Sequence, residues 1–205
     1  MIDGFRLLPE FLPTTAQQDL MEAVLERIPR APLYQPAMPR TGKPLSVRMT
    51  NFGPLGWISD VSGYRYQAAH PETGVPWPEI PQCLITLWDE LSGYDAPPEA
   101  CLVNWYGPGA KLGLHVDADE DADDAPVISI SLGDRALFRI GGPRRSDPTK
   151  SVRLASGDVV VLGGSARQAF HGIDRVHAGT SRLVPGGGRI NLTMRRVTRP
   201  NRQTA

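Results

Sequence analysis

Short apolar runs separated by glycine, proline and aspartate follow one another through the second half of this 205-residue chain. Glycine and proline make up 41 of its residues and show no collagen-like repeat, so they indicate frequent turns. Six β-rich runs with no helical pattern between them predict an antiparallel sandwich or jelly roll. The predicted strands are Ala100–Tyr106, Val127–Leu132, Ala136–Ile140, Ser151–Ala155, Val159–Leu162 and Gly188–Val197.

The first half of the chain is less regular and contains two predicted helices. Thr15 and Gln18 have the spacing of a capping box, and an apolar helical face follows until Pro29: Leu20, Met21, Val24, Leu25 and Ile28. Residues 29–44 carry five prolines and are predicted to run extended across the surface. A second helix is predicted from Pro81 to Gly93, because proline suits a helix start and glycine a helix end.

Charge and cysteine content limit the location and the partners. The 22 basic and 22 acidic residues cancel, so no net field draws the chain to nucleic acid or a membrane. Residues 117–124 nevertheless hold six carboxylates, while seven arginines and no acid follow Asp174, which leaves room for local anion binding. Cys83 and Cys101 stand alone and are predicted to be reduced core thiols. Without a signal pattern or an 18-residue apolar run, the protein is expected to be soluble and cytoplasmic.

The last predicted strand shows the clearest alternation of apolar and polar residues. One face is apolar and is predicted to pack in the core: Ile190, Leu192 and Met194. The other face is polar: Arg189, Asn191, Thr193 and Arg195. This polar face either meets solvent or lines a polar cavity.

His115 and Asp117 are candidate metal ligands. Side chains two residues apart on an extended segment point the same way, so an imidazole and a carboxylate can reach one ion. The third ligand would be His70, His171 or His177, of which His171 is best placed because it follows a predicted strand of the same β region. Two histidines and one carboxylate form the facial triad of non-haem iron oxygenases. Spacing alone leaves open that both histidines are hydrogen-bonded structural residues.

The polar face of the last strand suggests a cosubstrate site. A dicarboxylate such as 2-oxoglutarate needs a buried cation with bidentate geometry. Arg189, with Asn191 and Arg195 on the same face, can supply such groups. Asn104 and Tyr106, two residues apart on another strand, add hydrogen-bonding groups that can meet the same ligand.

Several of these segments together carry a family resemblance. They are NWYGPGAKLGLHVDADE (104–120), HGI (171–173) and RINLTMR (189–195), and upstream MTNFGPLGW (49–57), GYRY (63–66) and PWP (76–78). This combination closely resembles the bacterial AlkB-type DNA dealkylases over roughly residues 45 to 196. The resemblance implies a mainly β fold with flanking helices, namely a double-stranded β-helix (jelly roll) with an N-terminal nucleotide-recognition flap. One structural domain is expected, with helices and flap in residues 1–99, the catalytic core in 100–199 and a tail in 200–205.

The resemblance also implies residue roles and cofactors, namely Fe(II), the cosubstrate 2-oxoglutarate and O2. Fe(II) would be held by the catalytic residues His115, Asp117 and His171. The distal carboxylate of 2-oxoglutarate would meet Arg189, Asn104 and Tyr106, and its end near the metal Asn191 and Arg195. Trp57 and His115 would sandwich the damaged base, Asp119 would meet its exocyclic amine, and the nucleotide backbone would contact Tyr64, Tyr66 and Arg145.

The implied activity is oxidative demethylation of 1-methyladenine and 3-methylcytosine in DNA, preferably single-stranded, by a monomer that needs no membrane. Hydroxylation of the N-methyl group yields an unstable hydroxymethyl adduct that releases formaldehyde, so the protein's main task is positioning. In a duplex the damaged nucleotide must first be flipped out. Methylated adenine and cytosine are cationic, and Asp119 and Glu120 are expected to favour them.

Two alternatives remain at this stage. The first is a 2-oxoglutarate hydroxylase that acts on RNA, protein or a small molecule. The second is a non-enzymatic, cupin-like module whose histidines hold a structural metal. Trp105 and Ala118 replace basic residues of enterobacterial family members, which should weaken phosphate attraction and bears on substrate preference.

Overall fold

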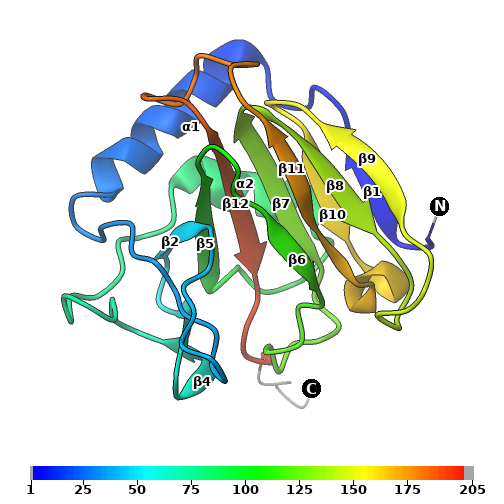
Figure 1. Ribbon diagram of the computed structural model, residues 1–205, viewed down its shortest axis with the longest axis horizontal. Helices are drawn as coiled ribbons and strands as arrows, with labels where there is room; N and C mark the ends of the chain where they lie inside the picture. Colours follow the sequence, from blue (N-terminus) through cyan, green and yellow to red (C-terminus); the bar gives the residue numbers. More distant parts are fainter. Residues whose placement is uncertain (1, 201–205) are drawn as a thin grey trace.

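Twelve strands and two α-helices make up residues 2–200, the part of the chain that the computed structural model describes (Figure 1). The main antiparallel sheet has the order β1 (Phe5–Leu8), β10 (Val159–Leu162), β7 (Val127–Gly133), β12 (Arg189–Arg195), β5 (Ala100–Tyr106) and β2 (Arg48–Phe52). The minor antiparallel sheet has the order β6 (Leu112–His115), β11 (His171–His177), β8 (Arg135–Ile140) and β9 (Lys150–Leu154). The predicted mainly β fold with flanking helices is confirmed.

The two helices, α1 (Thr14–Arg27) and α2 (Gln82–Leu91), cover the outer face of the main sheet (Figure 1). Their buried residues pack with the apolar face of β12: Leu20, Met21 and Val24 from α1, Leu84, Leu87 and Trp88 from α2, and Ile190, Leu192 and Met194 from β12. Each fully buried aliphatic side chain stabilises the fold by about 1.5–3 kcal/mol. Neither helix in the described part of the chain is long and apolar enough to cross a membrane.

Three details differ from the sequence expectation. The capping box is wrong, because α1 begins at Thr14 and its first turn has no side-chain cap. Leu25 is 38% exposed, since it lies at the margin of the apolar face. Cys101 is buried as predicted, but Cys83 is exposed because the buried face of α2 is formed by its neighbours from Leu84 onward.

The six predicted strands are all present, with ends within one or two residues of the expected positions. Residues 29–44 form neither helix nor strand, as the prolines predict. Six further strands were not predicted: β1, β2, β6, β11 and the two strands of a hairpin, β3 (Gly56–Asp60) and β4 (Gly63–Gln67).

The hairpin of β3 and β4 is the structural counterpart of the expected flap, and we call it the flap hairpin. A Cβ atom at Gly56 would lie 2.5 Å from the Trp77 ring, so only glycine allows the hairpin to approach that ring so closely. The Asn51 side chain accepts a hydrogen bond from Trp57 N and donates one to Trp57 O, both at 3.0 Å. These contacts fix the backbone of Trp57 relative to the main sheet.

The N-terminal residues also take part in the core. β1 pairs with β10, and β2 pairs with β5, so both edges of the main sheet come from the first 52 residues. The expected division at residue 99 stays a prediction. Of the expected tail, residues 201–205 lie outside the described residues.

The inner faces of the two sheets enclose a cavity lined by both polar and apolar side chains. The polar face of β12 points into this cavity and is buried, with Arg189 only 1% and Arg195 only 5% exposed. The choice between solvent and a polar cavity, which the sequence left open, is thereby decided in favour of the cavity.

Candidate active site

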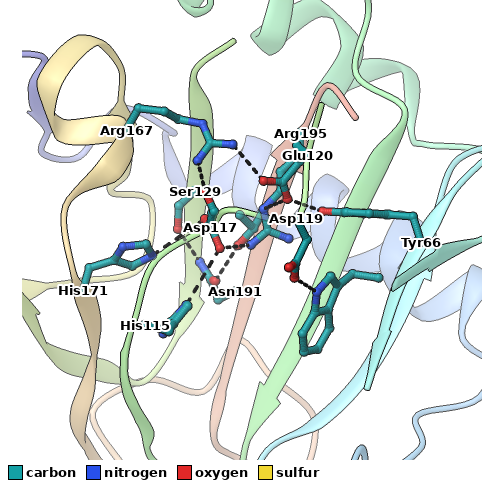
Figure 2. A network of polar contacts seen from close by, with 12 residues as sticks. Tyr66, His115, Asp117, Asp119, Glu120, Ser129, Arg167, His171, Asn191 and Arg195 are labelled. Atoms are coloured by element: carbon teal, nitrogen blue, oxygen red, sulfur yellow. Dashed lines mark hydrogen bonds and ion pairs between the residues drawn. The ribbon is translucent and has the colours of Figure 1, made fainter. Parts of the chain in front are cut away.

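His115 and His171 face each other across two strands of the minor sheet. β6 ends at His115, which pairs in register with His171 at the start of β11, and the two ring centroids are 4.5 Å apart. Gly172 makes this approach possible, because a Cβ atom there would lie 2.6 Å from the carbonyl oxygen of Leu112. Asp117 follows two residues after His115, and one ligand atom from each of the three residues lies within 4.8 Å of the others. Figure 2 shows the three side chains converging.

The protonation of both imidazole rings suits metal binding. Nδ1 of His115 lies 2.9 Å from the carbonyl oxygen of Gly113, and Nδ1 of His171 lies 3.0 Å from that of Ala169. A carbonyl oxygen only accepts, so each Nδ1 carries the hydrogen and each Nε2 keeps a free lone pair. These Nε2 atoms lie 3.9 Å and 3.8 Å from the Asp117 carboxylate oxygens. Such backbone contacts are typical of metal-binding histidines.

Electrostatics keep the group free of extra protons. Burial, reinforced by the nearby His115, lowers the pKa of His171 to about 4, so its ring is neutral at pH 7. Burial of Asp117 raises the pKa of its carboxyl group, but Arg195, both histidines and Arg167 hold that pKa well below its usual range. Arg195 donates to Asp117 Oδ1 at 2.8 Å, and the buried Oδ2 has no hydrogen-bond partner among the described residues. A neutral imidazole and an ionised carboxylate with a free oxygen are the states that metal binding requires.

The other two histidines do not join the cluster. His70 is buried, with Nε2 at 2.8 Å from Pro32 O, while its Nδ1 accepts hydrogen bonds from two backbone amides. His70 is therefore the hydrogen-bonded structural histidine that the sequence left as an alternative for the pair. His177 is exposed at the far end of β11.

Arg189 is a buried cation with unused donors. It donates to the Ser131 hydroxyl at 2.9 Å and lies over the Tyr106 ring at 5.3 Å, but its Nε and Nη1 have no partner among the described residues. Burial lowers the pKa of Arg189 and, partly offset by Arg189, raises that of Tyr106 to about 12. A buried guanidinium without an anion is costly, so this arrangement fits an anionic ligand that accepts two hydrogen bonds.

Strand register brings the remaining cosubstrate candidates to the same place. Asn191 of β12 lies opposite Asn104 of β5, and Arg189 lies opposite Tyr106. The buried Asn104 Oδ1 has no partner among the described residues, whereas Asn191 donates to the Ser129 hydroxyl at 2.7 Å. All five predicted cosubstrate residues line the cavity between the sheets: Asn104, Tyr106, Arg189, Asn191 and Arg195. The unpaired donors and acceptors fit a bound dicarboxylate beside the metal ligands.

A second hollow opens between this cavity and the flap hairpin. Four of the predicted substrate residues line it together with His115 and Asp117: Trp57, Tyr64, Asp119 and Arg145. Trp57 donates from its indole nitrogen to Asp119 Oδ2 at 2.7 Å and stacks on Tyr64 with ring centroids 5.5 Å apart. Arg145 donates to the carbonyl oxygen of Leu114 at 2.8 Å.

Tyr66 and Glu120 point away from this hollow into a buried ionic network (Figure 2). Burial raises the pKa of Tyr66 well above its ordinary value, and its hydroxyl donates to Glu120 Oε1. Glu120 also pairs with Arg167 at 2.8 Å and with Arg195 at 3.5 Å. The expectation that Glu120 attracts a cationic base is therefore wrong, because two guanidinium groups already compensate its charge. The predicted contact of Tyr66 with a nucleotide backbone stays a prediction.

Sequence reasoning missed several residues that support the site. Ser129 and Ser131 alternate on the inner face of β7, a local signal that strand analysis can detect. Arg167 lies on the 3-10 helix η1 (Gly164–Gln168) and reaches Glu120 across 47 residues of sequence, which no local pattern reveals. Asp134 binds the segment before β12 and is likewise a long-range contact.

The chain also matches known proteins over almost its whole length. The model of the 2OG-Fe(II) oxygenase superfamily matches residues 4–195. The chain is 56% identical to the alpha-ketoglutarate-dependent dioxygenase AlkB homolog of Caulobacter vibrioides, with 96% of this chain and 89% of the relative covered. It is 42% identical to the dioxygenase AlkB of Escherichia coli, with 95% and 90% covered.

A solved structure supports the same relationship. The structure of OsALKBH1 superposes with a TM-score of 0.79 at 33% identity and covers 96% of this chain and 98% of the other. Together with a His-Asp-His cluster and an unpaired buried arginine that suit the cofactors, these matches exclude the non-enzymatic alternative. The chain belongs to the AlkB-type branch of the 2OG-Fe(II) oxygenase superfamily and is a dioxygenase that uses Fe(II), 2-oxoglutarate and O2.

Proposed function

We propose that this dioxygenase oxidatively demethylates N-alkylated bases in DNA, with 1-methyladenine and 3-methylcytosine as substrates and single-stranded DNA preferred. One observation carries the proposal. His115, Asp117 and Arg195 line both the cavity between the sheets and the hollow beside the flap hairpin, so a base in the hollow lies next to the metal ligands.

The residues of the inner cavity prepare the oxidant. His115, Asp117 and His171 hold Fe(II), which with O2 and 2-oxoglutarate supplies an oxidant strong enough to remove hydrogen from an unactivated methyl group. Arg189 anchors the distal carboxylate of 2-oxoglutarate through its two unused donors, with Asn104 and Tyr106 beside it. Asn191 and Arg195 bind the end of 2-oxoglutarate nearer the metal.

The residues of the outer hollow hold the nucleotide. The base lies between Trp57 and His115, where stacking contributes about 1–3 kcal/mol. The carboxylate of Asp119 accepts from the exocyclic amine and favours a cationic, methylated base. Tyr64, Arg145 and Tyr66 contact the nucleotide backbone.

Access to the base explains the preference for single strands. The methyl groups of 1-methyladenine and 3-methylcytosine lie on the Watson–Crick edge, so a duplex must release the base at a cost of a few kcal/mol. A single strand avoids this cost. The protein acts as a monomer in the cytoplasm, and RNA carrying the same lesions is the rival substrate.

The test is an assay of succinate and formaldehyde with Fe(II), ascorbate and 2-oxoglutarate. Methylated single-stranded DNA, the same sequence as duplex, the matching RNA and no nucleic acid are compared. Equal amounts of succinate and formaldehyde, highest with single-stranded DNA, are expected. Succinate without formaldehyde from any nucleic acid would favour a protein or small-molecule hydroxylase, and a preference for the RNA strand would reassign the substrate.

A further inference from the structure

Glu120 joins three parts of the molecule at one buried carboxylate. Its Oε1 accepts from the hydroxyl of Tyr66, which lies on β4 of the flap hairpin. Its Oε2 accepts from Arg167 at 2.8 Å, on the 3-10 helix before β11. Arg195 of β12 lies 3.5 Å away, and Figure 2 shows these side chains around the acid.

The same two arginines also hold Asp117. Arg195 donates to Asp117 Oδ1 at 2.8 Å, and Arg167 donates to the backbone carbonyl oxygen of Asp117. A third donor of Arg167 binds the carbonyl oxygen of Ala125 at 2.9 Å and ties down the end of the acidic segment. Both the carboxylate and the backbone of Asp117 are therefore positioned by groups that depend on Glu120 for charge compensation.

The flap hairpin has few other reasons to remain closed. A two-stranded hairpin is marginally stable by itself. Its links to the acidic segment are the bond from Trp57 to Asp119, which lies in an exposed position, and the buried bond from Tyr66 to Glu120. Hydrogen bonds to a charged, buried acceptor are stronger than neutral ones, so the bond to Glu120 is the main fastening.

We propose that Glu120 is a positioning residue that couples closure of the flap hairpin to the metal ligand Asp117. When the hairpin closes, Tyr66 completes the partners of Glu120, and the two arginines are held where they orient Asp117. Coupling of this kind is reciprocal, so metal binding favours the closed hairpin by the same factor by which closure strengthens metal binding. The inference rests on the proposed ligand set.

The test removes one hydroxyl. Tyr66→Phe keeps the ring and deletes the donor to Glu120, whereas Tyr94→Phe deletes a comparable bond of 3.2 Å to Asp124, in the same acidic run but outside the flap hairpin. Co(II), a redox-inert substitute for Fe(II), is titrated into each protein without DNA. Amide hydrogen exchange of residues 56–67 is measured with and without Co(II).

For Tyr66→Phe we expect Co(II) affinity to fall about fivefold, within the usual range of coupling between sites. We also expect faster exchange in residues 56–67 and a smaller protection by Co(II). Tyr94→Phe should match the wild type in both measurements. Wild-type Co(II) affinity in Tyr66→Phe, or a looser hairpin with unchanged affinity, would overturn the coupling. Failure of the ligand set itself is separate, because it would appear as unchanged Co(II) affinity in His171→Ala.

Discussion

Arg189 is buried between the sheets, and its Nε and Nη1 find no partner among residues 2–200. Replacement by Met, which is of similar length but uncharged, should raise the KM for 2-oxoglutarate about 100-fold, since two charge-assisted hydrogen bonds contribute roughly 1.5–3 kcal/mol each. The measurement is the dependence of succinate formation on 2-oxoglutarate concentration.

A thermal control separates anchoring from damage to the fold. Removing an uncompensated buried charge should leave the Arg189→Met protein at least as stable as the wild type without 2-oxoglutarate. Added 2-oxoglutarate should then raise the Tm of the wild type but not of the variant. An unchanged KM would show that the anchor of the cosubstrate lies elsewhere.

Trp57 is expected to act on the base and not on the cosubstrate. For Trp57→Ala, affinity for methylated single-stranded DNA should fall about tenfold, which corresponds to roughly 1.4 kcal/mol of lost stacking. Succinate formation without DNA should continue, because Trp57 does not line the cavity between the sheets. Fluorescence anisotropy with methylated and unmethylated oligonucleotides checks this. The same affinity for methylated DNA as in the wild type would contradict the stacking role.

Local spacing explains which residues the sequence could predict. His115 and Asp117, like Asn104 and Tyr106, are separated by two residues, and extended backbone turns such pairs to one side. The partners of Glu120 could not be predicted in this way, because Tyr66 is 54 residues away in sequence and Arg167 is 47 residues away.

At the scale of elements, Asp134 connects the β7–β8 turn to the segment that precedes β12. Its buried carboxylate accepts from the backbone amides of Thr180 at 2.8 Å, Ser181 at 2.9 Å, and Gly179 and Gly188 at 3.2 Å. β12 begins immediately afterwards with Arg189. Asp134 thus fixes the point at which the cosubstrate strand enters the main sheet.

Asp134→Ala should lower the free energy of unfolding by about 3 kcal/mol, because buried amides lose their acceptor. Its KM for 2-oxoglutarate should also rise as Arg189 becomes less well placed. Urea denaturation and succinate kinetics provide the measurements. Asp174→Ala, which removes the exposed ion pair with Arg139, is the control and should cost less than about 1 kcal/mol. Equal losses in both variants would contradict the role of Asp134.

The six missed strands share features that weaken a strand pattern. β6 and β11 are joined with a register shift, and β11 carries polar residues on its outer side. The flap strands begin with Gly56 and Gly63, residues that disfavour regular strands. The strands with continuous apolar or alternating patterns, such as β10 and β12, were predicted closely because burial alone determines their residues.

At the scale of the whole molecule, the main-sheet order could not be read from the chain. β12 lies between β7 and β5, and β1 pairs with β10 from the opposite end of the sequence. Sequence patterns indicate which residues are buried but carry little information about which strand pairs with which. The family resemblance therefore supplied the jelly roll, and the register then brought residues of β5, β6, β11 and β12 around one cavity.

The central claim is that this cavity and the adjoining hollow act together on a methylated base. Mass spectrometry of a single-stranded oligonucleotide with one 1-methyladenine tests it most directly, before and after incubation with Fe(II), O2 and 2-oxoglutarate. The wild-type protein should remove the mass of one methylene unit, which restores adenine, and Asp117→Ala should leave the mass unchanged while remaining folded. An unchanged mass with the wild type, or the same loss with Asp117→Ala, would contradict the account.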